Sequence, residues 1–478
     1  MWLTIIDAFE GGIIATPCRA GFPKRKVMNS PSIARAHWSN RWAFILVTAG
    51  SAVGLGNIWK FPYMTGTNGG SAFVLVYLAC IVAIGIPLLM AETLLGRRGQ
   101  GNPVDSMRTV VAEAGASRLW HIVGLIGILG AVLILSFYSV VAGWILDYLV
   151  QATHGFKGMD NDDLSAAFAR LLADPVRLIA WHTVFMVLNV AVVAKGVTSG
   201  IERANKIMMP ALFVILLILL GYGLTAADMP AAFRFMFHFD AKAISSGVIL
   251  SAMGHAFFTL SLGMGAIMTY GSYLDSDTSI PRTCLYITLA DTVVALMAGL
   301  SIFAIVFAQG LEPAAGPGLI LQTLPLAFSH MPMGETVGIL FFVLLSFAAW
   351  TSSISLIEPP TALLVEHFAI RRPLAVAVVG FVAWLLGIAV ALSFNDWSGF
   401  TLFGLGIFDL LDSLTTKIMM PLAGLLIAVF VGWVMKRDDV EQEIAMSAGH
   451  FRLWFNVLRY VAPVAIVLIF LNVIGLIG

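Results

Sequence analysis

Ala49-Gly50-Ser51-Ala52-Val53-Gly54-Leu55-Gly56-Asn57 is the stretch that decides the fold, and it lies inside the first apolar span of the chain. Three glycines interrupt this span, and glycine weakens a helix because its backbone loses more conformational freedom on folding. Unwound backbone at membrane depth is tolerated only where it lines a cavity inside the protein. The break therefore predicts carbonyls free to bind a cation and N–H groups free to bind a carboxylate. A close contact between helices, which small residues also permit, is the alternative.

A second apolar span is interrupted in the same manner at Phe257-Phe258-Thr259-Leu260-Ser261-Leu262-Gly263-Met264-Gly265. Each half of the chain thus contains one broken span with hydroxyl groups and glycines near its middle. Paired interruptions of this kind are the sequence signature of a transporter built from inverted repeats.

Composition places the chain in a membrane. Of its 478 residues 59% are hydrophobic and 11% are charged, whereas soluble domains carry about a quarter charged residues. The 27 basic and 27 acidic residues balance, which argues against a nucleic-acid surface. Three cysteines (Cys18, Cys80 and Cys284) form no spaced set, and no zinc cluster, P-loop or Rossmann fingerprint occurs. We therefore expect a membrane protein that is not an enzyme.

Stretches of about 20 apolar residues predict eleven spans. They cover residues 42–63, 70–95, 121–150, 176–195, 204–226, 245–273, 281–310, 336–368, 373–394, 400–435 and 453–477. The connection 151–175 reads as a solvated loop, and 311–335 reads as a loop with short helical pieces.

Lys and Arg gather in alternate connections, which predicts a cytoplasmic N-terminus and, with eleven spans, a C-terminus outside. Splitting the first ten spans into five and five puts one break at the start of each half and gives the halves opposite topology. We expect an all-α polytopic membrane protein with a five-plus-five inverted repeat. Its parts are a tail (1–34), a first repeat (35–226), an inverted repeat (227–435) and an eleventh span (436–478). The tail is either a true cytoplasmic segment or in part an upstream extension before Met28.

Polar side chains in the later spans suggest a cation site. Ala348, Thr351, Ser352 and Ser355 share one helix face, and hydroxyl and carbonyl oxygens suit a hard cation. Ser and Thr in membrane helices also simply bond back to the backbone. Asp291 is ionisable within a span, so it is either a cation ligand or a proton carrier.

Two further side chains in the spans carry weaker signals. His255 is either a hydrogen-bonded pore-lining residue or a proton relay. Tyr138 and Ile134 could wall a substrate cavity, although aromatic residues in spans usually just pack.

Five motifs in order resemble the neurotransmitter:sodium symporter family, particularly its short bacterial amino-acid transporters with eleven helices. They are Trp38-Ser39-Asn40-Arg41, Ala52-Val53-Gly54-Leu55-Gly56-Asn57-Ile58-Trp59-Lys60-Phe61-Pro62, Asn68-Gly69-Gly70, Phe258-Thr259-Leu260-Ser261-Leu262-Gly263 and Thr351-Ser352-Ser353. The resemblance runs from about Arg35 to the eleventh span. It implies the family's LeuT-type fold with discontinuous helices 1 and 6, and sodium-coupled symport of an amino acid into the cell by alternating access.

The resemblance also implies site residues. The first sodium site would use Ala52, Asn57, Thr259 and Asp291 together with the substrate carboxylate. The second would use Gly50, Val53, Ala348, Thr351 and Ser352. The substrate would lie against Ser51, Ala52, Gly54, Ile134, Tyr138, Phe258, Thr259, Ser261, Met264, Ser352 and Leu356.

Several positions refine this expectation. Biogenic-amine members place an Asp at the position of Gly54, so a ligand with its own carboxylate is expected, and the apolar pocket favours a hydrophobic or aromatic amino acid. Asp291 stands where others have Asn, and its charge predicts chloride independence. His255 replaces a Gln of the family. A twelfth span is absent, as in some bacterial members.

Gates are also implied at both ends of the substrate site. Outside, Lys60 replaces the family's Arg and would face Asp412, with Phe258 as the lid of the substrate site. Because Lys cannot form the bidentate pair that Arg forms, we expect a looser gate. Inside, Arg35 would pair with Glu366, with Trp38 as the plug and Tyr273 nearby.

The expected setting is a bacterial inner (plasma) membrane, with the amino-acid substrate and the lipid bilayer as partners and no obligatory protein partner indicated. A channel would need a continuous polar stripe, and a membrane enzyme would need a nucleophile–base pair or a metal cluster. The nearer alternative is a proton-coupled amino-acid carrier that uses Asp291 or His255.

Overall fold

The computed structural model describes residues 37–239, 241–313 and 319–473, and every regular element in them is a helix. Within these residues nine helices are long and apolar enough to span a membrane. The pair Arg41–Ala52 and Gly56–Thr67, bent by 47°, would make a tenth. The shorter pair Ser246–Thr259 and Ala266–Gly271 occupies the predicted sixth span. The all-α polytopic class is confirmed, and the count of eleven stays a prediction.

The first half of the chain contains three long helices, several short ones and four segments of π- or 3-10 helix. In order they are α2 (Arg41–Ala52), η1 (Gly56–Lys60), α3 (Phe61–Thr67), α4 (Ser71–Cys80), η2 (Ile81–Gly85), α5 (Ile86–Gly99), α6 (Pro103–Ala114), η3 (Arg118–His121), α7 (Ile122–His154), α8 (Asn161–Ala173), α9 (Pro175–Val193), η4 (Val197–Glu202) and α10 (Arg203–Ala226).

The second half begins with a short outer helix and the second broken span. In order the elements are α11 (Met229–Phe237), η5 (Ala241–Ala243), α12 (Ser246–Thr259), α13 (Ala266–Gly271), α14 (Ile280–Ala308), η6 (Leu319–Thr323), α15 (Leu324–His330), α16 (Gly334–Phe368), α17 (Arg372–Leu392), α18 (Ile407–Asp412), η7 (Ser413–Met419), α19 (Met420–Val429), η8 (Phe430–Val434), α20 (Arg437–Ile444), α21 (Ala448–Asn456), η9 (Val457–Val461) and α22 (Ala462–Val473).

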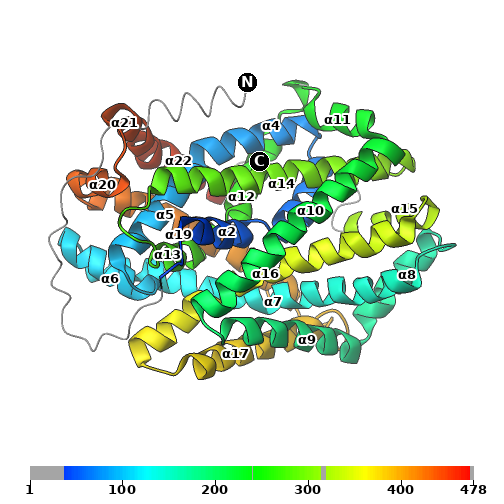
Figure 1. The fold of residues 1–478 in the computed structure, drawn as a ribbon, viewed down its shortest axis with the longest axis horizontal. Helices are drawn as coiled ribbons and strands as arrows, with labels where there is room; N and C mark the ends of the chain where they lie inside the picture. The colour runs from blue at the N-terminus through cyan, green and yellow to red at the C-terminus, as the bar shows by residue number, and fades with distance from the viewer. Residues whose placement is uncertain (1–36, 240, 314–318, 474–478) are drawn as a thin grey trace.

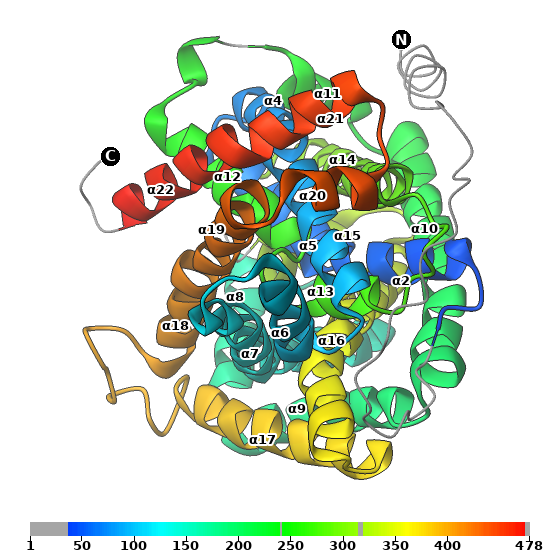
Figure 2. The same cartoon turned by 90° about the vertical axis from the view of Figure 1, so that its left-hand side faces the viewer.

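The long helices α7 and α16 pack against each other along the molecule, and α9 and α17 lie against α7 on one side (Figure 1). α14 packs against α2 and α10, and α13 packs against α5. The view along the helices shows α13 between α5 and α16, near the middle of the bundle (Figure 2), and residues 51–57 and 259–265 are buried throughout. Both interruptions are therefore buried inside the bundle, where free backbone groups are tolerated.

The connections between spans are more helical than expected. The prediction of a solvated loop over 151–175 was wrong in part, because Asn161–Ala173 forms α8. Its start is a capping box in which the side chains of Asp160 and Asp163 each accept from the other residue's backbone N–H. Residues 319–330 form η6 and α15, as expected for a connection with short helical pieces. The tenth span begins at Ile407 rather than near 400, after a connection that follows α17.

Candidate functional site

The first break separates α2 from η1. α2 ends at Ala52, Val53 has an extended backbone (φ −71°, ψ 97°), and the N–H of Gly54 donates to Asn57 Oδ1 at 3.0 Å. A Cβ on Gly54 would lie 2.2 Å from Ser352 Oγ and 3.4 Å from the Tyr138 hydroxyl. Gly54 is thus required because α16 and α7 approach the unwound backbone closely.

The second break follows α12 at Thr259. Ser261, Gly263 and Gly265 all have positive φ angles of 54°, 76° and 74°. This conformation is strained for a non-glycine residue such as Ser261, and such strain concentrates at functional sites. Ser261 Oγ donates to the carbonyl of Ser51 at 2.9 Å, so a hydrogen bond joins the two breaks.

A small cavity lies between the breaks. Its walls come from α2, η1, α7, α12, α16 and the two breaks, and no lining side chain is charged. The lining residues are Ser51, Ala52, Gly54, Leu55, Gly56, Ile134, Tyr138, Phe258, Ser261, Met264, Ser352 and Leu356.

The cavity contains ten of the eleven residues predicted to contact a substrate. Thr259 is the exception, and it lies instead against Asp291. Leu55 and Gly56 line the cavity but were not in the predicted set. The buried Tyr138 hydroxyl has no hydrogen-bond partner in the described part of the chain, so it is a donor available to a ligand.

The five residues of the expected second sodium site converge between α2 and α16. Thr351 Oγ1 lies 3.5 Å from the Val53 carbonyl and 3.1 Å from that of Ala348. Ser352 Oγ lies 3.4 Å from the Gly50 carbonyl. Thr351 also bonds back to Phe347 within its own helix at 3.0 Å, so the structural role of its hydroxyl stands beside the cation role.

The expected first sodium site centres on Asp291, which is fully buried in α14. Asn57 Nδ2 donates to Asp291 Oδ1 at 2.7 Å, and Thr259 Oγ1 lies 3.1 Å and 3.2 Å from the two carboxylate oxygens. Tyr77 adds a distant contact of 3.5 Å. Ala52 is placed at the adjoining break, where it lines the cavity.

The donor chemistry of both clusters fits a hard cation. Hydroxyl, carbonyl, amide and carboxylate oxygens are the groups that such ions prefer, and thiolates and imidazoles are not among them. Within the described ranges no group of three or more His, Cys, Asp or Glu residues could hold a softer metal.

His255 lies on α12 beside these clusters and is buried in an aromatic cage. The rings of Phe61, Phe73 and Tyr77 surround it at centroid distances of 5.9, 6.0 and 5.4 Å. Neither of its ring nitrogens has a hydrogen-bond partner among the described residues. Among the described residues His255 therefore has no hydrogen-bonded group to which it could relay a proton.

A buried carboxylate that the sequence reasoning missed supports the second break. Glu92 of α5 is 1% exposed, and its Oε2 accepts from the N–H of Gly263 at 3.0 Å. A carboxylate in an apolar span is itself a signal of function. Applying that rule to every span, as was done for Asp291, would have found Glu92.

One end of the cavity is closed by a group that we call the Trp38 end: Trp38, Tyr270, Tyr273, Glu358 and Arg372. Trp38 Nε1 donates to the Tyr270 carbonyl at 3.1 Å, and both tyrosine rings contact the indole at centroid distances below 6 Å. Glu358 is fully buried and accepts from Tyr273 at 2.9 Å and from Arg372 at 3.0 and 2.5 Å. Tyr273 lies beside Trp38, as expected, whereas Glu358 and Arg372 were missed.

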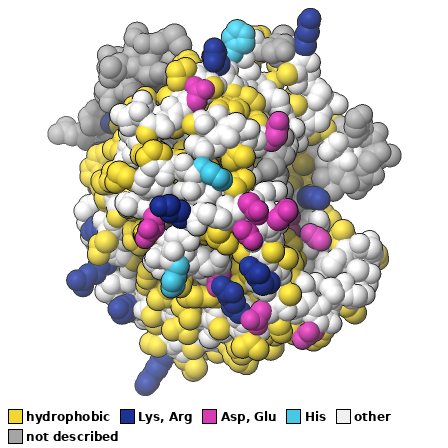
Figure 3. Space-filling model, turned by 90° about the vertical axis from the view of Figure 1, so that its right-hand side faces the viewer, with side chains coloured by type: hydrophobic (Ala, Val, Ile, Leu, Met, Phe, Trp, Pro, Cys, Tyr) yellow, Lys and Arg dark blue, Asp and Glu magenta, His cyan; other side chains and the backbone are white. Residues whose placement is uncertain are grey.

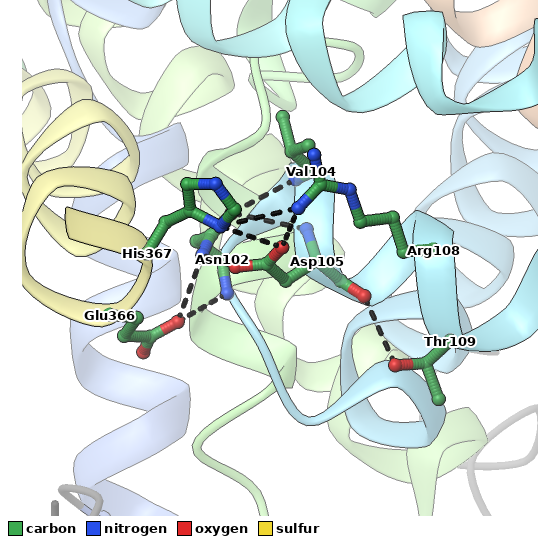
Figure 4. Close-up of polar contacts among 7 residues, drawn as sticks. All are labelled: Asn102, Val104, Asp105, Arg108, Thr109, Glu366 and His367. Atoms are coloured by element: carbon green, nitrogen blue, oxygen red, sulfur yellow. Dashed lines mark hydrogen bonds and ion pairs between the residues drawn. The ribbon is translucent and has the colours of Figure 1, made fainter. Parts of the chain in front are cut away.

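Glu366 lies on the last turns of α16, where its carboxylate accepts from the backbone and side chain of Asn102 at 2.6 and 3.2 Å (Figure 4). Asn102 also caps α6 and donates to Asp105 at 2.7 Å. The expected partner Arg35, like the N-terminal tail, lies outside the described residues. The contact that the structure gives Glu366 therefore joins α16 to the start of α6.

The opposite end, which we call the Lys60 end, contains Lys60, Phe258 and Asp412. Lys60 Nζ lies over the Phe258 ring, 4.1 Å from its centroid. Phe258 in turn lines the cavity, where it was expected as a lid. In the described residues Lys60 forms no ion pair with Asp412, so the expected contact across this gate is not made in this conformation.

Comparisons with known proteins agree with this geometry. The family model described as the sodium:neurotransmitter symporter family matches residues 35–157 and 173–477. An uncharacterized sodium-dependent transporter of Bacillus subtilis is 39% identical over 448 residues, 92% of this chain and 98% of the relative. The mouse sodium- and chloride-dependent GABA transporter 2 is 23% identical and is matched over 76% of this chain and 68% of its own length.

A solved structure, that of MhsT in complex with L-phenylalanine, matches with a TM-score of 0.85 and 42% identity. The match covers 92% of this chain and all of that one. The chain belongs to the sodium:neurotransmitter symporter family, whose members are transporters rather than enzymes, and it is a sodium-dependent symporter.

Proposed function

We propose that the protein carries a hydrophobic or aromatic amino acid into the cell together with two sodium ions and without chloride. The observation that supports this most directly is the cavity between the two breaks, whose lining contains no charged side chain. An amine ligand would need a carboxylate there, and Gly54 supplies none. A zwitterion brings its own carboxylate, which Tyr138 and a sodium ion at the first cluster can receive.

Substrate class follows from the apolar part of the cavity lining. Ile134, Met264, Phe258 and Leu356 present apolar surface, and methionine adapts to ligands of different shape. The bound phenylalanine in MhsT agrees with an aromatic side chain in a cavity of this kind.

Coupling follows from a shared ligand. A sodium ion held by Asn57, Thr259 and Asp291 and by the substrate carboxylate makes the affinity of each depend on the other, and this linkage is reciprocal. A sodium ion in the second cluster would hold α2 to α16, and its release would free them. Each ion moving down about 100 mV supplies roughly 2.3 kcal/mol, and a tenfold gradient adds about 1.4. Two ions supply roughly 7 kcal/mol, enough to concentrate a zwitterion on the order of 10⁵-fold.

The orientation that we propose puts the Trp38 end in the cytoplasm. Arg97, Arg98, Lys206 and Arg372 lie near the ends of their spans in alternate connections, and basic residues gather on the cytoplasmic side. Asp291 would supply the negative charge that chloride supplies in chloride-dependent relatives.

Uptake of labelled amino acids into proteoliposomes tests the proposal, with sodium, chloride and pH gradients imposed separately. We expect sodium-driven uptake of aromatic and branched amino acids that does not change when chloride is removed. If two sodium ions are coupled, the uptake rate should rise more steeply than linearly with sodium concentration. Uptake driven by a pH gradient without sodium would refute the proposal and favour a proton carrier that uses Asp291 or His255.

A further inference from the structure

A second hollow in the molecule lies away from the cavity, where the end of α10 meets α11. It is shallow and open to the surroundings, and it is bordered by Leu224, Met229, Pro230, Phe233 and Arg234. We call it the α11 groove. Leu224 and Phe233 are 65% and 58% exposed, so large apolar surfaces at its border are uncovered by the chain itself.

Hydrogen bonds and close helix packing fix the position of α11 beside α10 and α14, so the α11 groove is part of the fold. Asp228 caps α11 by accepting from Ala231 N at 3.0 Å, and its own N–H donates to the Ala304 carbonyl of α14 at 3.1 Å. A Cβ on the buried Gly223 would lie 2.9 Å from Met229 Cε, so glycine lets α10 approach the start of α11. The inner face of α11 is buried, and Phe233 and Arg234 are left on its outer face.

The groove continues the lipid-facing surface of α10. Val214, Leu217, Ile218 and Leu224 are each about half exposed or more, and their spacing puts them on one face of the helix. In a membrane span such a face contacts acyl chains. Because α10 ends beside α11, at the right-hand end of Figure 1, this apolar stripe leads directly into the α11 groove.

Arg234 places a positive charge at the end of this apolar stripe. Arg234 is exposed, and within the described ranges its guanidinium forms no ion pair and donates no hydrogen bond. The carboxylate of Asp228 is used by the α11 cap. Hydrophobic, basic and acidic side chains meet on this end of the molecule, as expected where a protein passes from acyl chains to headgroups (Figure 3).

We propose that the α11 groove binds an anionic phospholipid of the leaflet that meets this end of α10. An acyl chain lies against Leu224, Met229 and Phe233, and the phosphate lies on Arg234, whose planar guanidinium matches phosphate oxygens in a bidentate manner. The inference rests on the membrane setting of the family and is independent of the transported substrate.

Native mass spectrometry of the full-length protein with dioleoyl phosphatidylglycerol, against phosphatidylcholine with the same chains, tests the site. We expect Arg234→Gln to weaken phosphatidylglycerol binding roughly tenfold, because a charge-assisted hydrogen bond to the phosphate is lost, and to weaken phosphatidylcholine binding less, because its choline ammonium already offsets the phosphate charge. Arg170→Gln is the matched control, since Arg170 is also exposed on a short helix, α8, at this end, away from the groove. It should bind as the unmodified protein does.

Leu224→Gln tests the apolar half and should also weaken binding of the long-chain lipid, without a change of charge. Equal binding by Arg234→Gln and the unmodified protein would overturn the proposal, as would an equal loss in Arg170→Gln. A further outcome is that inorganic phosphate at the same concentration displaces the lipid while Leu224→Gln has no effect on lipid binding. That result would show a site for small anions and would equally overturn the proposal. The uptake assay is read separately, so failure here leaves the proposed substrate untouched.

Discussion

The two ends of the cavity are closed by different interactions. At the Trp38 end, a buried indole contacts two tyrosines, and a fully buried carboxylate is held by an arginine and a tyrosine hydroxyl. At the Lys60 end, one ammonium group lies over the ring of Phe258, and no ion pair with Asp412 adds to it in the described residues. A single cation–π contact is worth about 0.5–2 kcal/mol, whereas opening the Trp38 end separates two ring contacts of the indole and its hydrogen bond to the Tyr270 carbonyl. This conformation should therefore open more readily at the Lys60 end.

A cavity separates the two ends, and Gly54→Asp should fill it. The new side chain would meet Ser352 Oγ and Tyr138 and would place an unpaired carboxylate where the substrate carboxylate is expected. We expect sodium-driven uptake to fall below detection. Gly449→Asp is the control, because a side chain at Gly449 meets open space. Uptake at the unmodified level in Gly54→Asp would refute the pocket.

Arg372→Gln should weaken the Trp38 end most. It removes the cationic partner of the Glu358 carboxylate and leaves that buried charge with the Tyr273 hydroxyl, so we expect uptake to fall about 100-fold from the cost of an uncompensated buried charge. The double variant Glu358→Gln with Arg372→Gln should recover part of the loss, because neither charge remains alone. Uptake and thermal unfolding of these two variants and of the unmodified protein would measure this. An equal or larger loss in the double variant would contradict the account.

Thr351→Ala with Ser352→Ala should loosen the link between α2 and α16 that the proposed second sodium ion makes. We expect the sodium concentration for half-maximal uptake to rise roughly tenfold as hydroxyl ligands are lost. Ser353→Ala is the matched control, since Ser353 Oγ faces Asn189 Oδ1 at 2.6 Å rather than α2. Unchanged sodium activation in the double variant would remove the second sodium site.

Lys60→Arg should strengthen the weaker end by a small amount. A guanidinium can both stack on Phe258 and form a bidentate pair with Asp412, so dissociation of labelled substrate to the outside should slow about threefold. Lys417→Arg, an exposed cation on η7, controls for a general effect of arginine. Faster dissociation in Lys60→Arg would show that Lys60 does not close this end.

The residues that line the cavity were predicted from the sequence more completely than the buried charged residues around it. The cavity residues lie within ordered motifs around two glycine-rich breaks, and ten of the eleven expected contacts line one cavity. Glu92 and Glu358 carry the same signal as Asp291, a charge within an apolar span, but the sequence does not name the partners of Glu92, Glu358 or Arg372, which lie on other elements. The loop expected over 151–175 is helical at α8 because Leu164, Ala167 and Leu171 bury one helix face and a capping box at Asp160 fixes the start.

The sequence by itself determined the membrane class, the two broken spans and the oxygen-rich residues beside them. Those properties follow from hydropathy, from glycine's backbone freedom and from side-chain chemistry, all of which are local. Only the tertiary structure decided which groups meet: Glu358 with Arg372, Glu366 with Asn102, and Lys60 with Phe258 rather than with Asp412. Contacts between distant helices depend on how the whole bundle packs, and a single sequence does not encode that packing in any one segment.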